Sequence, residues 1–123
     1  MGRRGFTLVE LLVVIGISSF FLLFSFSSYR SFQAGLYLKA FAHLGASELR
    51  KVQGLAQSQG KTLSWSLDQL IPPKEVKVSK NETFKFSSSG FPLPGGTGTA
   101  ILRNSFSRDK KIVVSSVGRV RVE

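Results

Sequence analysis

The sequence predicts an α+β protein in which one long N-terminal helix packs on a C-terminal antiparallel β-meander. Three observations predict this fold: an apolar stretch over residues 6–26, a proline-free stretch with apolar positions three and four apart to about residue 58, and a change to period two from Lys61 onward. With 123 residues, the chain has room for one small domain beside such a helix.

The first element, Phe6 to Phe26, comprises 21 residues and contains one charge, Glu10. As a helix it would be roughly 30 Å long, which is the thickness of the hydrocarbon core of a bilayer. We therefore expect residues 6–26 to span a membrane once. Arg3 and Arg4 precede the stretch and would stay in the cytoplasm, so that the rest of the chain faces outward.

Three interpretations of this stretch compete: a signal peptide removed after it, a plain membrane anchor, and a segment cut before it. A carboxylate inside a spanning helix costs on the order of 3 kcal/mol near the centre, so an ordinary anchor or signal has little reason to carry Glu10. Ser25-Phe26-Ser27 is a weak small-x-small cleavage site, which leaves the ordinary signal peptide open.

The string from Gly5 to Ile15, Gly-Phe-Thr-Leu-Val-Glu-Leu-Leu-Val-Val-Ile, resembles the class III signal of type IV pilins and type II secretion pseudopilins. The resemblance implies that a prepilin peptidase cuts after Gly5, removes residues 1–5 as a leader and methylates the new amino terminus on Phe6. It also implies that Glu10 pairs with the Phe6 ammonium of a neighbouring subunit. The physical logic agrees, because an unpaired buried charge costs several kcal/mol.

Two departures from the family pattern point to the kind of pilin. Many major pilins carry a proline where this chain has Ser27, and many carry a C-terminal cysteine pair, whereas this chain has no cysteine. Both departures favour a minor pilin or pseudopilin.

The second element, residues 27–60, is expected to be an amphipathic continuation of the helix, ended by Gly60 as a C-cap. His43 is expected to be solvated or at the edge of the core rather than a ligand. The expected apolar face consists of Phe41, Leu44, Leu49, Val52, Leu55 and Ala56.

The last part, residues 61–123, is expected to be a β-rich periplasmic region. Pro and Gly make 88–96 a loop, and a turn at 80–82 would make 83–87 the partner of 75–79. The expected strands are 62–67, 75–79, 83–87, 97–103, 110–115 and 119–123. The side chains expected to pack on the helix include Val76, Val78, Phe84, Phe86, Ile101 and Val113.

The closing pattern from Lys111 to Val122, with Phe86-Ser-Ser-Ser-Gly90 upstream, resembles the GspH/FimT family of H-type pseudopilins and FimT minor pilins. Both kinds have the type IV pilin-like fold. The resemblance therefore implies a non-enzymatic, membrane-anchored subunit of a type IV pilus or a type II secretion pseudopilus. Its partners would be other pilin subunits, the prepilin peptidase and inner-membrane lipid.

The charge of the chain points to a further partner. A formal net charge of +10 favours a polyanion, either nucleic acid or an anionic membrane surface. Gly118-Arg119-Val120-Arg121 is similar to the DNA-contacting tail of some FimT-type competence pilins, and alternation in a strand puts both arginines on one face. The nearby cations that would widen the patch for double-stranded DNA are Arg103, Arg108, Lys110 and Lys111.

Two alternatives stay open at this stage. The arginines are also explained as a solvated edge-strand face, and H-type pseudopilins with no DNA affinity end in a similar way. A secreted enzyme or binding domain with an ordinary signal peptide has less support: the acids are scattered, no Ser/His/Asp constellation is visible, and Pro94-Gly95-Gly96 lacks the lysine of a phosphate loop. With no cysteine and one histidine, we expect no metal site and no cofactor.

Overall fold

The computed structural model describes residues 5–123. Residues 1–4, which make up most of the expected leader and include Arg3 and Arg4, lie outside the described residues. The chain divides into two compact units, one ending at Gln33 and the other comprising Ala34–Glu123. The helix α1, Leu8–Gln59, contributes residues to both units, and each unit is described separately below.

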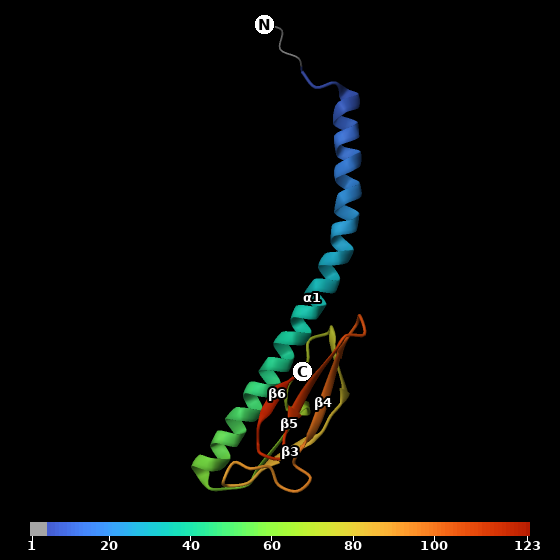
Figure 1. The fold of residues 1–123 in the computed structure, drawn as a ribbon. Coiled ribbons are helices and arrows are strands. Elements are labelled where there is room, and N and C mark those ends of the chain that lie inside the picture. Colours follow the sequence, from blue (N-terminus) through green and yellow to red (C-terminus); the bar gives the residue numbers. More distant parts are fainter. Residues whose placement is uncertain (1–4) are drawn as a thin grey trace. The chain divides into compact units, whose positions relative to one another are not determined.

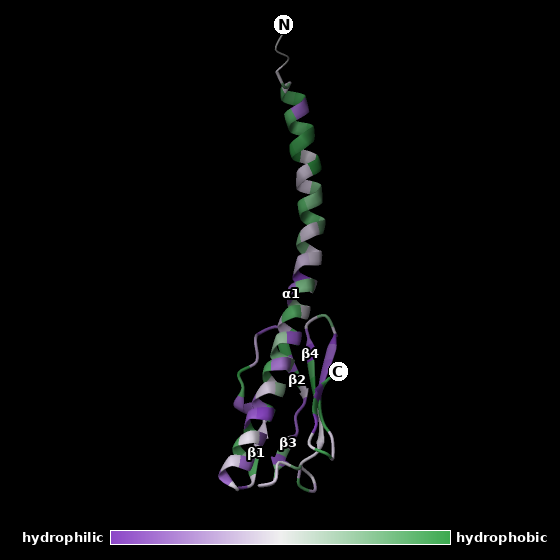
Figure 2. Ribbon diagram, turned by 60° about the vertical axis from the view of Figure 1, so that its left-hand side comes forward, coloured by the Kyte–Doolittle hydropathy of each residue, from purple (hydrophilic) through white to green (hydrophobic). Residues whose placement is uncertain are grey.

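The apolar part of α1 has the features of a membrane-spanning segment. By length and composition α1 is able to cross a membrane, and none of its most apolar window is buried within the protein. The first half of the helix is mostly hydrophobic in Figure 2. Phe20 and Phe24, one turn apart, stack edge to face with ring centroids 4.8 Å apart.

The other end of α1 stops where the sequence predicts. Gly60 has φ 61°, and the backbone N–H of Lys61 donates to the carbonyl oxygen of Ala56 at 3.2 Å. A residue of positive φ after the last turn, combined with this bond, is the Schellman arrangement that ends many helices. The expected C-cap at Gly60 is confirmed.

Within the second unit, the buried face of α1 differs from the expected one at two positions. Leu44 and Leu55 are exposed. His43 is exposed too, in agreement with the expected solvated position. Small residues take the buried positions, because they let the strands approach the helix closely: a Cβ on Gly45 would lie 2.8 Å from Cδ1 of Ile112. The buried residues of α1 are Ala34, Leu38, Phe41, Ala42, Gly45, Ala46, Leu49 and Ala56.

The strands form two antiparallel sheets (Figure 1). One pairs β1, Leu63–Ser66, with β3, Thr83–Phe86, and the 3₁₀ turn η1, Leu67–Gln69, follows β1. The other has the order β2-β4-β5-β6, and its last three strands are consecutive, as in a meander. Its strands are β2, Val76–Lys80; β4, Gly98–Asn104; β5, Asp109–Val114; and β6, Val120–Val122. The fold is therefore α+β, with the long helix and antiparallel strands of a type IV pilin-like arrangement.

The predicted hairpin between residues 75–79 and 83–87 is wrong. β2 pairs with β4, and β3 pairs with β1. The pairing register of β2 slips between Val78 and Lys80, and the side-chain carbonyl of Asn81 accepts the backbone N–H of Leu67 at 3.3 Å. Residues 80–82 thus carry the chain from one sheet to the other instead of closing a hairpin.

The inward-facing residues of β4 and β5 also differ from the expected ones. Ile101 and Val113 are only half-buried, because they point away from α1. Continuous apolar runs such as Ile112-Val113-Val114 do not show which alternate residues face the core. Val76, Phe84 and Phe86 are buried as expected, and the buried residues of β4 and β5 are Ala100, Leu102, Asn104, Ile112 and Val114.

Candidate functional site

The first candidate site is the start of α1, where Thr7 and Glu10 form a capping box. The backbone N–H of Thr7 donates to Oε2 of Glu10 at 3.0 Å, and the backbone N–H of Glu10 donates to Oγ1 of Thr7 at 3.2 Å. Each side chain thereby satisfies a donor that the first helical turn leaves without an intrahelical partner. The Thr-x-x-Glu spacing is visible in the sequence, but the capping role of Glu10 was not predicted from it; the expected partner was the Phe6 ammonium of a neighbouring subunit.

The expected cleavage site precedes this cap. Gly5 and Phe6 are exposed and lie outside the helix, and the Phe6 side chain is 78% exposed. The peptide bond between them is therefore exposed and outside the helix. Two of the expected processing and assembly residues, Phe6 and Glu10, stand on either side of the helix N-terminus.

The second candidate site is the basic C-terminal region. Arg119 and Arg121 are exposed while Val120 between them is buried, so the predicted alternation is confirmed. Arg121 lies opposite Val113 of β5, on the sheet face away from α1. Within residues 5–123 neither guanidinium takes part in an ion pair or a hydrogen bond.

Gly118 has a packing role in the turn before these arginines. Its φ is 82°, and its N–H donates to the carbonyl oxygen of Ser115 at 2.9 Å. The side-chain amide of Gln53 donates to the carbonyl oxygens of both Gly90 and Gly118, at 2.7 and 3.1 Å. A Cβ on Gly118 would lie 2.9 Å from the nitrogen of that amide. The backbone that comes close to Gly118 is therefore the protein's own.

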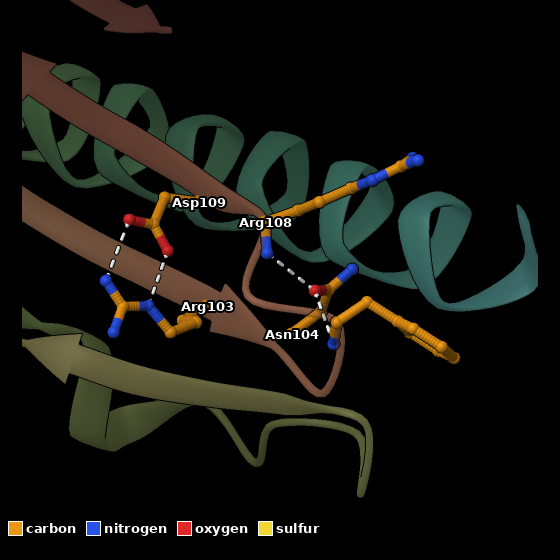
Figure 3. Close-up of polar contacts among 5 residues, drawn as sticks. Arg103, Asn104, Arg108 and Asp109 are labelled. Atoms are coloured by element: carbon orange, nitrogen blue, oxygen red, sulfur yellow. Dashed lines mark hydrogen bonds and ion pairs between the residues drawn. The ribbon is translucent and has the colours of Figure 1, made fainter. Parts of the chain in front are cut away.

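Arg103 is on the same sheet face but is already paired. Its Nε and Nη2 donate to the two carboxylate oxygens of Asp109 at 2.7 and 3.0 Å (Figure 3). This bidentate contact lowers the pKa of the Asp109 carboxyl and raises the pKa of the Arg103 guanidinium. Arg103 therefore does not offer a free guanidinium to a ligand.

The other expected cations are not all in one place. Lys111 is exposed and, like Arg121, faces away from α1, opposite Ile101. Lys110 lies opposite Leu102, whose side chain is in the core, and is half-buried. Arg108 follows the β4–β5 turn, and its Nη1 would lie 3.4 Å from a Cβ on Gly35 of α1. The structure thus brings together Lys111, Arg119 and Arg121, and separates Lys110 and Arg108 from them.

Two cations on this face, Lys77 and Lys80, were not predicted, and Lys80 is already paired with Glu82. Lys77 of β2 is exposed and lies directly opposite Arg103 of β4. Alternation with Val76 and Val78 does indicate that Lys77 points outward, but only the β2–β4 pairing brings it next to the C-terminal strands. Among residues 5–123, no group of three or more His, Asp or Glu side chains is placed to hold a metal ion.

Comparison with known proteins defines the N-terminal site. Residues 1–26 match the family described as the prokaryotic N-terminal methylation motif, which is the signal of the type IV pilin family. The chain thus carries a type IV pilin processing and methylation signal at the start of a pilin-like α+β fold. No curated protein and no solved structure matches the chain.

Proposed function

We propose that this protein is a minor pilin or pseudopilin of the GspH/FimT class, a non-enzymatic subunit of a type IV pilus or type II secretion pseudopilus. The methylation motif over residues 1–26, at the start of a helix whose most apolar window is not buried within the described residues, supports a pilin-like subunit. The GspH/FimT class rests on the resemblance of residues 111–122 to that family. Residues 6–26 anchor the subunit in the bacterial inner membrane, and the domain that follows is periplasmic.

Assembly depends on Glu10 in this proposal. Cleavage after Gly5 leaves an ammonium group on Phe6, and in a filament the Glu10 carboxylate of a neighbouring subunit lies against it. Two opposite charges neutralise each other in an apolar core, where either one alone would cost several kcal/mol. The pairing would set the stagger between subunits, and other pilin subunits and the prepilin peptidase are the partners it requires.

Processing and assembly are tested separately. Intact mass and N-terminal sequence of the protein isolated from cells should show a chain that starts with methylated Phe6. Glu10→Ala should leave the protein folded in the membrane but absent from the sheared filament fraction, whereas Glu48→Ala, an acid on the same helix, should be incorporated normally. A mature chain starting near Ser28, or normal incorporation of Glu10→Ala, would contradict the proposal.

We further propose that the periplasmic domain binds double-stranded DNA without sequence preference during DNA uptake. Support comes from the unpaired guanidinium groups of Arg119 and Arg121 and from the net charge of the mature chain. Loss of Arg3 and Arg4 with the leader takes that charge from +10 to +8. Arginine donates two parallel hydrogen bonds to a phosphate, and release of counterions from DNA drives such binding.

The DNA-binding proposal predicts a specific salt dependence. Full-length protein in detergent micelles should bind a duplex with an affinity that falls steeply with salt. Combining Arg119→Ala with Arg121→Ala should reduce the slope of log K against log salt by about 1.8, since each lost phosphate contact contributes about 0.9. Lys39→Ala with Lys51→Ala removes the same charge from α1 and should change the slope little.

A second candidate function is assembly of a secretion pseudopilus with no DNA affinity. One observation favours it: the conformation of Gly118 and its contacts with Gln53 and Gly90 explain this glycine by packing alone. This candidate predicts no duplex binding even at low salt, and a defect in the release of secreted proteins when the gene is deleted.

A further inference from the structure

The open face of the four-stranded sheet carries cations from all four strands. Residues that are directly opposite in an antiparallel pair share a face, so the register defines this surface. Lys77, Arg103 and Asp109 are opposite one another across β2, β4 and β5. Two residues further along β5, Lys111 lies opposite Ile101 and, through two backbone hydrogen bonds, Glu123. Arg121 lies opposite Val113, and Arg119 is two residues before Arg121.

These positions place the cations on a diagonal across the sheet. From Lys77 the diagonal passes Arg103 and Lys111 and ends at Arg121 and Arg119, and we call Lys77, Lys111, Arg121 and Arg119 the cation track. With strands about 4.8 Å apart and a rise of about 3.4 Å per residue, the Cα atoms of its two ends are roughly 25 Å apart. Asp109 and Glu123 both lie on one side of the diagonal, beside Lys111, and after the Arg103 contact the Lys111 charge contributes to the lowered pKa of the Asp109 carboxyl. Neither acid forms an ion pair with a member of the track within residues 5–123.

The cations of this face differ in whether they are already neutralised. Lys80 forms an ion pair with Glu82 at 2.6 Å, and Arg103 forms one with Asp109 at 2.7 Å. In the described part of the chain, residues 5–123, the four members of the cation track form no ion pair. Four exposed charges are therefore available to a ligand, and a fifth, Arg103, is held next to them by Asp109.

The composition of this face favours a nucleic acid over a membrane. The large apolar residues of this face are Ile101 and Val113, which lie between the cations and are half-buried. Proteins that bind a bilayer surface add exposed apolar side chains to their cations. In residues 34–123 the large hydrophobic side chains that are exposed belong to α1 or to loops: Leu36, Tyr37, Leu44, Leu55, Ile71, Phe91, Phe106 and Val117. A linear track with no apolar side chain to insert suits a rod-shaped polyanion.

We propose that the cation track is the duplex-binding surface, that Lys77 contacts a phosphate at the end opposite Arg119, and that Asp109 weakens binding by holding Arg103. This inference rests on the DNA-binding function proposed above, and it differs from a C-terminal tail in requiring β2 and in excluding Arg108 and Lys110. When the duplex is bound along the diagonal, the four members of the track contact four of its phosphates. Arg103 contacts a fifth phosphate when Asp109 releases it.

The contribution of Lys77 is measured against Lys80, which is on the same strand and carries the same charge. For full-length protein in detergent micelles titrated with a fluorescent duplex, Lys77→Ala should lower the salt slope by about 0.9 and the affinity by up to about tenfold at 50 mM salt. Lys80→Ala should change the affinity less than twofold. Equal effects of the two variants would overturn the role of Lys77.

The role of Asp109 gives a test by gain of binding. Asp109→Asn should raise the salt slope by about 0.9 and tighten duplex binding severalfold, because it frees Arg103 and removes a negative charge. Adding Arg103→Ala to Asp109→Asn should return the slope to that of the unaltered protein. If Asp109→Asn leaves the salt slope unchanged while thermal melting shows that the variant is folded, the ion pair with Asp109 does not keep Arg103 from the duplex.

These outcomes are distinct from failure of DNA binding itself. If the unaltered protein does not bind the duplex at 50 mM salt, the proposed DNA-binding function fails and the track has no duplex to bind. If the protein binds and depends on Arg119 and Arg121 but not on Lys77, only the track is overturned. Nanodiscs with and without anionic lipid provide the competing surface. If anionic nanodiscs do not displace the duplex, the track is supported. If anionic lipid protects Lys77 and the duplex does not, the track is overturned.

Discussion

The carboxylate of Glu10 accepts a hydrogen bond from the backbone N–H of Thr7, three residues earlier, at 3.0 Å. The acid therefore has a donor within its own chain before any neighbouring subunit arrives. An apolar environment penalises a carboxylate without partners, and in the membrane-anchored state that we propose the capping box reduces this penalty. In the assembly that we propose, the Phe6 ammonium of a neighbouring subunit is a stronger partner than the Thr7 N–H, because it adds charge to the hydrogen bond.

Thr7→Val should loosen the first turn of α1. It removes the hydroxyl that accepts the Glu10 N–H but keeps the shape of the side chain, and the loss of an N-cap costs about 1 kcal/mol. Amide hydrogen exchange in micelles should show the Glu10 N–H exchanging roughly fivefold faster. Thr7→Ser keeps the hydroxyl and should exchange at the original rate; equal protection in Thr7→Val would show that the capping box does not hold the helix start.

Gly118→Ala should destabilise the second unit more than Gly95→Ala. Both glycines have φ near 80°, and an L-residue there costs about 1–2 kcal/mol. Only Gly118 is packed, against Gln53 and Gly90, whereas a Cβ on Gly95 meets nothing within 4 Å. Denaturant titration should give Gly118→Ala a free energy of unfolding about 1 kcal/mol lower than that of Gly95→Ala, which corresponds to the loss of one hydrogen bond of Gln53. Equal losses would mean that the contact is energetically neutral.

Ser107→Gly should stabilise the protein. The loops 104–108 and 115–119 share one pattern: the first residue donates to the fifth and its carbonyl accepts from the fourth. The fourth residue has positive φ in both loops, but it is Ser107 in one and Gly118 in the other. Relief of this φ, less the entropy of the more flexible unfolded chain, should amount to about 0.5–1 kcal/mol. Thermal melting should show a higher Tm for Ser107→Gly and a lower Tm for the neighbouring Ser105→Gly.

Stability should fall in acid partly through Glu82. The pKa of its carboxyl is lowered, first by the contact with the Lys80 ammonium and then by the backbone N–H of Thr99, which donates to it at 2.8 Å. A group whose pKa is lower in the folded state stabilises the fold above its unfolded pKa, and this contribution is lost as the pH falls through the folded pKa. We therefore expect the loss below about pH 4.5, the ordinary value for glutamate.

Denaturation midpoints at pH 7 and pH 3 measure this contribution. Between those pH values the midpoint should fall less for Glu82→Gln than for the unaltered protein, because the glutamine does not titrate. Glu75→Gln, at an exposed position, should behave like the unaltered protein. A fall of the same size in all three proteins would assign the acid sensitivity to other groups.

Local patterns predicted much of this protein. The helix and its end at Gly60 follow from apolar spacing and a glycine in the right place, and the six strands follow from period two between Pro and Gly. The alternation around Arg119 and Arg121 was predicted because neighbouring Val120 and Val122 have one clear inward side. These features depend on contacts between residues close in the chain, which a sequence displays directly.

Other features were not predictable in this way. The partner of residues 83–86 was misassigned because the 80–82 turn has hairpin composition, whereas the bond from Leu67 to Asn81 joins residues 14 apart. The outward orientation of Ile101 and Val113 was missed because β4 and β5 are apolar on both sides. Leu44 and Leu55 were expected inside because hydrophobicity was weighed without size, while close packing of helix and sheet required Gly45 and alanines.

By itself the sequence determined the processing signal, the membrane-spanning length, the α+β class and the excess of positive charge, because each is a property of one continuous stretch or of composition. The tertiary structure alone decided which cations share a surface and which of them remain unpaired. Lys77 and Arg121 are 44 positions apart in the sequence and belong to strands at opposite edges of one sheet. Strand pairing sets that relation, and it arises from long-range hydrogen bonds and burial that no local pattern contains.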